Sequence, residues 1–347
     1  AFNINLPLGV LVIIGLLIWA TESKQDHREG GLDIVGALIS VVMFSTLVFG
    51  LIEGRVYGWW NASSAHPFEI GGFKWPTDGI SIIPVSLAIS VIFFVLFVLW
   101  ERARDKAHKN VLLDLDLFKI ASFRNGSFAA LIISMGEFGL LFAIPLWLQN
   151  VEGLTPVSSG LVLLWLAGGA FLASGVGGAM SGKLPAVRAV QIGVLFELIG
   201  VAGISLVATT GGGWWPVAPF LLLYGIGVGL ATAQLTGVIM VEVPMTKIGQ
   251  ASGSQSTVRQ IGSALGIAVL GTILFTATQA AADTRLNATQ ALQAMPSDQR
   301  ATFIEGLSTT VVDSSGGFLP MIKGTLLDAG APESAAVELQ NAANDAF

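Results

Sequence analysis

Residues 123–161 read FRNGSFAALIISMGEFGLLFAIPLWLQNVEGLTPVSSGL. After Arg124 this stretch stays apolar as far as Trp147, which is enough chain for a helix that crosses a bilayer, since crossing takes ~20 residues. One acid, Glu137, interrupts it near the middle. A carboxylate at that depth costs roughly 2.5–3.5 kcal/mol on insertion scales and is by default a functional candidate. The stretch predicts a membrane span that contains a functional acid, followed by a polar turn that leads into a second span.

The composition of the whole chain supports a membrane protein. Of its 347 residues, 53% are hydrophobic and only 12% are charged, whereas about 25% are charged in soluble domains. The sequence has no cysteine, so it holds neither a disulfide nor a thiolate metal site, and its histidines show no metal-site spacing. The net charge of −6 and the absence of a basic patch exclude nucleic-acid binding. We expect no metal and no cofactor.

Apolar runs separated by short polar breaks recur along the chain. We place spans at residues 4–20, 34–51, 80–100, 127–148, 159–182, 187–208, 217–241 and 255–276. Each run is close to the ~17–25 residues of a spanning helix, and none shows the alternating polarity of a barrel strand. The predicted fold class is an all-α polytopic membrane protein with about eight transmembrane helices.

The lysines and arginines predict the orientation of these helices. Twelve of the 17 basic residues fall in one set of connections and five in the other, and basic loops mark the cytoplasmic side. We therefore expect a multi-pass protein of a bacterial plasma membrane, with the lipid bilayer as a partner and both ends of this chain outside. The basic connection 101–119 is either an amphipathic segment in the membrane interface or a solvated linker with a few buried leucines. Short helices are expected in the polar tail, at 298–307 and 332–343.

Four residues inside the spans are candidates for proton coupling or substrate binding. Glu137 and Glu197 are mid-span acids, and a carboxyl group that is shielded from water takes up a proton more readily. Gln234 is a candidate cavity-lining amide, and Trp165 offers an aromatic face to a cation. Each also has a structural interpretation: a neutral acid bonded to a neighbouring helix, an amide that joins two helices, or an indole in simple packing.

Small residues recur at four-residue spacing on three of the predicted spans. Such stripes let helix backbones approach closely in lipid, where van der Waals contact replaces the hydrophobic driving force. The stripes are Ala170, Ser174, Gly178 and Gly182; Gly225, Gly229, Ala233 and Gly237; and Gly262 with Gly266. We predict that they are helix contacts.

Four motifs, in order, make the chain resemble a known family. They are FNINLPLG from Phe2, DLDLFKIASF from Asp114, LQNVEGLTPVSSGL from Leu148 and VPMTKIGQASGSQSTVRQIGSALG from Val243. Together they are similar to segments of the fourteen-helix drug:proton antiporters of the major facilitator superfamily. The resemblance covers essentially the whole chain.

The resemblance implies a division of the chain that corresponds to helices six to thirteen, truncated at both ends. Residues 1–21 would be the last helix of the N-terminal bundle, and 22–110 two extra linker helices with their loops. Residues 111–276 would be five helices of the C-terminal bundle. Residues 277–347 would form an extracytoplasmic loop before a missing last helix.

The resemblance also assigns roles to individual residues. Glu137 and Gln234 would line the central cavity, whereas Glu197 would lie on a peripheral helix. Arg259 and Gln260 match an Arg-Gln pair that binds and orients the inner gate. The outer turn supplies three further motif residues, Gly153, Pro156 and Gly160. The chain departs from the family pattern at Trp165, which replaces a proline, and in the inner loop SGKLPAVR, which lacks an acid.

The resulting hypothesis is proton-coupled export of amphiphilic small molecules by alternating access, without enzymatic activity. Its partners would be the bilayer, the substrate and protons. One alternative is a polytopic membrane enzyme that acts on lipids, although His-Glu-x-x-His, Gly-x-Ser-x-Gly and paired aspartates are all missing from the sequence. Others are a transporter of the same fold for lipids, amino acids or siderophores, and a non-transporting sensor or assembly protein.

Overall fold

The computed structural model describes residues 5–19, 33–63, 66–179, 184–208, 212–293, 300, 303–304, 306–307, 321–328 and 332–346. Its helices are α1 (Asn5–Trp19), α2 (Ile34–Tyr57), α3 (Ile82–Lys106), α4 (Ala121–Leu146), α5 (Pro156–Ala179), α6 (Ala186–Val207), α7 (Ala218–Met240), α8 (Ile248–Ala288), α9 (Gln290–Gln293), α11 (Ile322–Asp328) and α12 (Glu333–Ala346). Within these residues, seven helices, α2 to α8, are long and apolar enough to cross a membrane by length and composition, and α1 is a shorter apolar helix. The predicted all-α membrane fold is confirmed.

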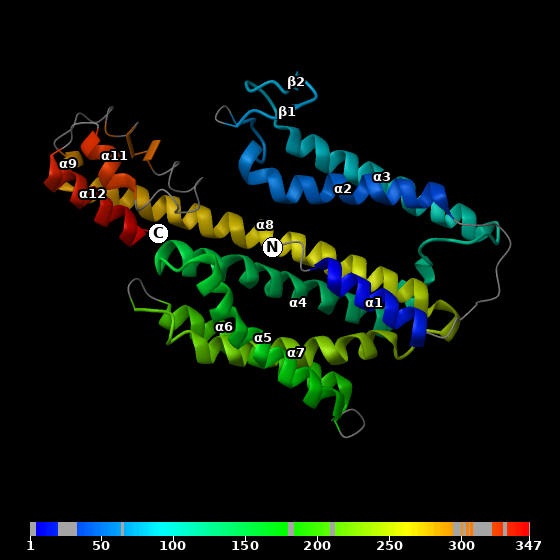
Figure 1. Cartoon of the computed structure of the whole chain (residues 1–347). Coiled ribbons are helices and arrows are strands. Elements are labelled where there is room, and N and C mark those ends of the chain that lie inside the picture. Colours follow the sequence, from blue (N-terminus) through cyan, green and yellow to red (C-terminus); the bar gives the residue numbers. More distant parts are fainter. Residues whose placement is uncertain are drawn as a thin grey trace.

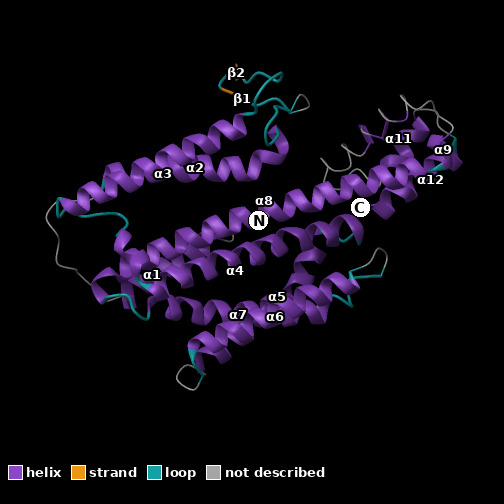
Figure 2. Ribbon diagram, turned by 180° about the vertical axis from the view of Figure 1, so that it is seen from behind, coloured by secondary structure: helices purple, strands orange, loops and turns teal. Residues whose placement is uncertain are grey.

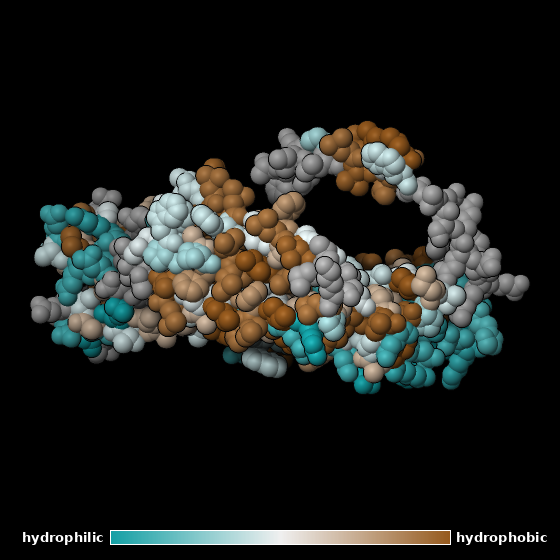
Figure 3. Space-filling view, turned by 90° about the horizontal axis from the view of Figure 1, so that it is seen from below, coloured by the Kyte–Doolittle hydropathy of each residue, from teal (hydrophilic) through white to brown (hydrophobic). Residues whose placement is uncertain are grey.

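The helices form two packed groups that meet at the long helix α8 (Figures 1 and 2). On one side α4 packs along α8, α7 packs on α4, and α5 and α6 each pack on α7. On the other side the antiparallel pair α2 and α3 contacts α8 through α2. Figure 3 shows polar surface at both ends of the molecule and apolar surface between them. That distribution is expected of a helical bundle that exposes its middle to lipid.

Small residues bring the helix axes together, as their spacing predicts. A Cβ atom added at Gly225 or Gly229 of α7 would collide with the backbone of α5 at Leu166 or Ala170. On α8, Gly262 and Gly266 meet the backbone of α4 in the same way. The stripes are only partly used: open space surrounds Gly178 and Gly237, and Gly182 lies outside the described residues.

Two buried apolar clusters form the core of the α4–α8 bundle at different depths. The inner cluster includes Leu117, Phe123 and Leu235, near the ends that carry the basic connections. The outer cluster includes Leu148 and Val217, with further side chains from α4, α5 and α6. The stretch of α4 between the two clusters contains Glu137, so any polar group there sits between two apolar layers.

The connection 107–120 packs against protein. Its 3₁₀ helix η2 (Leu115–Lys119) places Leu117 in the inner core with no exposed surface, and Val111 is 7% exposed. Leu112 and Phe118 face outward. Leu117 is thus a buried leucine of the kind that the linker interpretation expects.

Three elements differ from the sequence-based expectation. The loop between α2 and α3 contains a small antiparallel hairpin, β1 (Glu69–Ile70) and β2 (Phe73–Lys74), which was not expected from the sequence. Its turn residues Gly71 and Gly72 both have positive φ, the geometry that a two-residue hairpin turn requires. The end of α4 winds into a π-helix, η3 (Trp147–Val151), just after Pro145.

The third difference is the length of α8. The apolar run predicts an end near residue 276, but the helix continues to Ala288 and carries a small cap of α9, α11 and α12 (Figure 1). The cap has its own core of Leu286, Leu292, Ile304 and Leu339. The expected tail helix at 332–343 appears as α12, and the described residues of 298–307 are helical.

Helix α1 makes few contacts with the other described helices. Leu17 and Trp19 are each 81% exposed, and most of its other apolar side chains face outward. A helix this apolar on all faces needs lipid or other helices around it.

Candidate functional site

An ion pair joins α4 to α8 inside the bundle. Arg259 Nη2 of α8 lies 3.6 Å from Glu137 Oε2 of α4, and the two side chains are 30% and 15% exposed. Arg259 Nε also donates a hydrogen bond to Ser134 Oγ at 3.3 Å. Ser134 and Glu137 are three residues apart and share one face of α4. The glycine contact one turn after Arg259, between Gly262 and the backbone of Leu131, holds the two helices close enough for this pairing.

A second acid and a tyrosine lie deeper in the same bundle. Glu197 of α6 is 9% exposed and Tyr224 of α7 is 2% exposed. Their positions are fixed by glycines: Gly227 lies against the Glu197 side chain, and Gly200 lies against Tyr224. Glu137 and Glu197 are close enough for their charges to interact, and Tyr224 interacts with both. We call Ser134, Glu137, Glu197, Tyr224 and Arg259 the acid cluster.

The acid cluster contains polar atoms that have no hydrogen-bond partner. Among the described residues, Glu137 Oε2, Glu197 Oε1 and Tyr224 Oη are buried without one. Unpaired buried polar groups are expensive and are rare in native proteins, so each calls for an explanation such as a bound ion, an exchanging proton or a water. The cluster therefore has the free acceptor and hydroxyl capacity that proton exchange requires.

Gln234 lies elsewhere and is already engaged. Its Nε2 donates to the carbonyl oxygen of Gly177 at 2.9 Å, which ties α7 to α5. It also lines an apolar hollow of about 220 Å³ that is shared with Val176, Ile192 and Leu230. This geometry favours its role as a helix-joining amide, with one edge on a cavity.

The remaining predicted site residues are not brought into the acid cluster. Trp165 is 40% exposed on α5. Gln260 is exposed, so it diverges from its neighbour Arg259, which points toward α4.

The outer-turn motif shapes the connection between α4 and α5. Gly153 has a φ of +66°, which favours glycine. Pro156 is the first residue of α5, where its fixed φ suits a helix start. Gly160 is exposed with open space around it.

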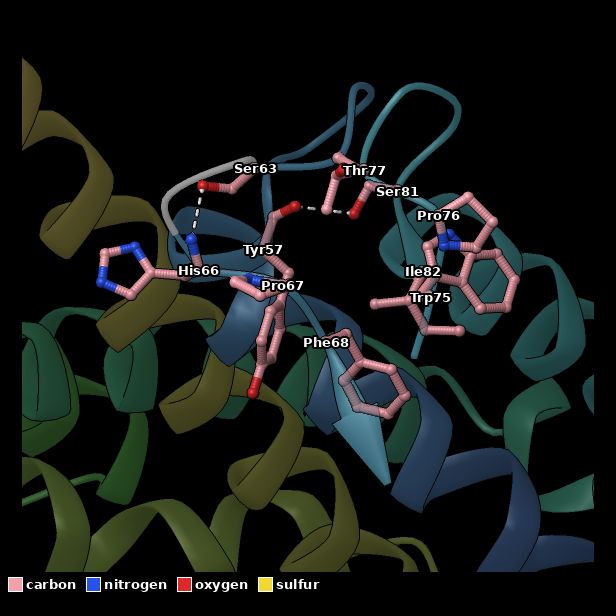
Figure 4. A pocket seen from close by; sticks show the side chains of 11 residues that line it. Tyr57, Ser63, His66, Pro67, Phe68, Trp75, Pro76, Thr77, Ser81 and Ile82 are labelled. Atoms are coloured by element: carbon pink, nitrogen blue, oxygen red, sulfur yellow. Dashed lines mark hydrogen bonds between the residues drawn. The ribbon is translucent and has the colours of Figure 1, made fainter. Parts of the chain in front are cut away.

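A pocket at the outer end of the α2–α3 pair is too small for an organic substrate. It measures about 10 Å³, room for about one water. Tyr57, Phe68 and Trp75 line it (Figure 4), and Ser81 Oγ donates to the Tyr57 carbonyl oxygen at 3.0 Å. Phe68 meets Tyr57 edge to face at 5.3 Å. The pocket is a small gap left where the β-hairpin loop packs against the ends of α2 and α3.

Sequence reasoning missed the partners of the two acids. It named no partner for Glu137 and gave Arg259 a gate role, whereas the structure pairs them. It also overlooked Tyr224, although a tyrosine inside the run LLLYGIG is one of only two in the chain. The resemblance placed Glu197 on a peripheral helix; its side chain nevertheless points inward, against α7.

Comparisons with known proteins identify the family. Residues 9–267 match the model of the Major Facilitator Superfamily. The chain is 30% identical over 273 residues to the multidrug resistance protein Stp of Mycobacterium tuberculosis, covering 79% of this chain and 46% of that protein. It is 28% identical over 274 residues to the tetracenomycin C resistance and export protein of Streptomyces glaucescens, covering 79% and 46%.

A third relative is the tetracycline resistance determinant of Streptomyces rimosus, 30% identical over 250 residues, which covers 70% of this chain and 64% of that protein. The chain spans about half the length of the first two relatives. The matched region runs from α1 well into α8 and contains the whole acid cluster. The family predicted from the four sequence motifs is confirmed: this chain belongs to the Major Facilitator Superfamily.

Proposed function

We propose that the chain forms part of a proton-coupled exporter of amphiphilic small molecules that works by alternating access. The observation that carries this proposal is the Glu137–Arg259 ion pair across the α4–α8 interface. Three relatives are named for multidrug resistance, antibiotic resistance or antibiotic export. Membership of a transporter family speaks against the alternative of a lipid-modifying enzyme.

The ion pair supplies a contact that depends on protonation. An anionic Glu137 attracts Arg259, and this attraction is strong where water is scarce. A protonated Glu137 has lost the charge that attracts the guanidinium, so proton uptake weakens the tie between α4 and α8 and proton release restores it. Helices that meet through glycines, as α8 meets α4 at Gly262 and Gly266, can respond by small rigid shifts.

Glu137 couples substrate binding to proton binding because the substrate and the proton compete for the same carboxylate. A cationic amphiphile and a proton both neutralise Glu137, so binding of one lowers the affinity for the other, as linkage requires. Glu197 and Tyr224 extend the arrangement, because they give a proton a second buried site within electrostatic reach of Glu137. Antiport of cation against H⁺ follows when the two occupants are released on opposite sides.

The test is Glu137→Gln in the complete gene product, expressed in cells loaded with a fluorescent lipophilic cation. We expect uncoupler-sensitive efflux to fall to background while the amount of folded protein in the membrane is unchanged. Glu53→Gln, an acid at the outer end of α2, is the matched control and should export like the unaltered protein. Efflux at the unaltered rate in the Glu137→Gln protein would remove this acid from the mechanism.

A further inference from the structure

A second pair of acids lies at the inner end of α2 and α3, far along the chain from the acid cluster. Asp33 caps the start of α2 and Glu101 lies near the end of α3; they are 8% and 1% exposed. A Cβ atom placed on Gly36 would lie 2.5 Å from Asp33 Oδ2 and 2.8 Å from Glu101 Oε1. The two carboxyl groups thus crowd one point beside Gly36, close enough for their charges to repel.

The facing oxygens accept no hydrogen bond. Asp33 Oδ2 and Glu101 Oε1 are buried without a hydrogen-bond partner among the described residues. Two carboxylate oxygens can only accept, so they cannot bond to each other unless one carries a proton. Two unprotonated carboxylates in contact also repel strongly where water is excluded, which is why such pairs retain a shared proton.

The two carboxyl groups are held unequally. Asp33 Oδ1 accepts hydrogen bonds from Gly36 N at 2.9 Å and from Trp100 Nε1 at 3.0 Å. Asp33 Oδ2 also forms an ion pair with Arg104, whose Nε lies 3.3 Å away. These two donors and the cation belong to α2 and α3. Glu101 Oε2 accepts only backbone N–H groups, from Leu112 at 3.1 Å and Leu113 at 3.4 Å.

Those two N–H groups belong to an irregular segment, residues 110–114, that we call the strap. Arg104 Nε donates to the carbonyl oxygen of Asn110 at 2.8 Å, which fastens the strap to α3. On its other side Gln250 Nε2 of α8 donates to the Val111 carbonyl oxygen at 2.8 Å, and Lys247 pairs with Asp114. The strap therefore joins the α2–α3 pair to the start of α8, the helix that carries Arg259.

We propose that Asp33 and Glu101 share a single proton, and that this proton keeps the strap fastened between the α2–α3 pair and α8. The charged side chain beside the pair in the described residues is Arg104 from α3, whereas Asp114 and Lys247 form their own ion pair at the end of the strap. With the proton, the pair and Arg104 are neutral in sum. Without it, one uncompensated negative charge is buried, and its proton has gone to the inner aqueous side.

The strap is the part that yields when the proton leaves. Asp33 is held by donors on two helices, whereas Glu101 is held only by the strap's backbone, so repulsion displaces Glu101 together with Leu112 and Leu113. Protonation fastens the strap and alkaline conditions loosen it. This inference does not rest on the proposed transport cycle, and its test uses no transport measurement.

The test is a distance measurement by electron paramagnetic resonance on the purified complete protein in lipid. One spin label replaces exposed Leu112 on the strap and the other replaces exposed Ala88 on α3, about 13 helical residues from Glu101 and so on the order of 20 Å away. We expect one narrow distance distribution at mildly acidic pH and a longer, broader one at mildly alkaline pH. In Glu101→Gln the amide donates to Asp33 without titrating, so the narrow distribution should persist at every pH.

Asp105→Asn is the matched control, an exposed acid one turn further along α3, and it should retain the pH response. Infrared spectroscopy of the unlabelled protein gives a second readout: a protonated carboxyl band that disappears on alkaline titration and is missing in Glu101→Gln. An unaltered protein without a pH-dependent distance change overturns the proposal. So does a Glu101→Gln protein that keeps the change, or an infrared band that Glu101→Gln leaves intact.

Discussion

At the scale of single residues, the decisive feature is that two acids in the described part of the bundle interior face a single cation, Arg259. Arg259 pairs with Glu137 and leaves Glu197 with Tyr224. Removing charges from water costs several kcal/mol per ion before any attraction is regained. The attraction within a pair that is 3.6 Å apart and partly exposed recovers only part of that desolvation cost. The free-energy difference between the charged and the protonated forms of Glu137 is therefore small enough for the proton to exchange.

We predict that the two members of this pair depend on each other. Arg259→Gln should lower the free energy of unfolding by ~1–3 kcal/mol, between the values for exposed and fully buried pairs, because it leaves Glu137 without its cation. Adding Glu137→Gln to that protein should recover most of the loss. Thermal unfolding in detergent of the unaltered protein, both single variants and the double variant gives the coupling energy. Additive losses would show that the two side chains do not interact.

Sequence could locate the acids but not their partners. Glu137 and Glu197 stand out in apolar runs because charge is costly in lipid. Whether Glu197 points to the bundle or away depends on the rotation of α6 about its axis. That rotation is set by the contacts of Gly193 and Gly227 across the α6–α7 interface, which no single-helix pattern contains.

At the scale of helices, packing rests on glycines placed opposite backbone. Gly262 and Gly266 of α8 meet Leu131 and Met135 of α4, and these contacts lie between the two residues of the ion pair, after Arg259 on α8 and before Glu137 on α4. In lipid such close approach substitutes for the hydrophobic effect. The α4–α8 interface therefore combines close backbone contacts at glycines with an ion pair that depends on the charge of Glu137.

We predict that widening this interface destabilises the protein. Gly266→Val introduces a branched side chain where even a Cβ would strike the Met135 carbonyl oxygen, and overpacking typically costs ~1–3 kcal/mol. Gly175→Val, on α5 where open space surrounds the glycine, makes the same chemical change without a collision. Thermal unfolding of the two variants should differ by that amount; equal midpoints would mean that α8 does not rest on α4 as described.

Helix positions were predictable and some helix ends were not. Within a bilayer every backbone group must be bonded internally, so apolar runs mark helices reliably. The end of α8 was missed because residues 277–288 are polar yet contain neither glycine nor proline, and Ala, Gln and Arg sustain a helix in water. The β-hairpin had a signal, Gly71-Gly72 between apolar residues, of the kind that favours a two-residue turn.

At the scale of the whole molecule, two polar ends flank an apolar middle (Figure 3). The basic connection that contains the strap lies at one end, and the cap on α8 lies at the other (Figure 1). If basic loops mark the cytoplasm, the cap faces outward. In this orientation the seven long helices cross the bilayer side by side and form one membrane domain.

We predict the labelling pattern that this orientation requires. The chain has no cysteine, so single cysteines report position without background from this segment. Met321→Cys in the cap should react with a membrane-impermeant maleimide on intact cells. Met245→Cys before α8 should react only after permeabilisation; both native side chains are exposed, by 59% and 85%. Labelling at position 245 in intact cells, with none at 321, would invert the topology.

The unbroken course of α8 has a mechanical consequence. Its 41 residues make a helix on the order of 60 Å long, about twice the thickness of the hydrocarbon layer. The N-terminal end of this helix lies beside the strap, and its C-terminal end lies in the cap. If a rigid helix of that length tilts by about 10° about its N-terminal end, its C-terminal end moves by about 10 Å. A small tilt of α8 near the strap would therefore produce a larger displacement of the cap, and an antibody fragment bound to the cap should restrict that tilt.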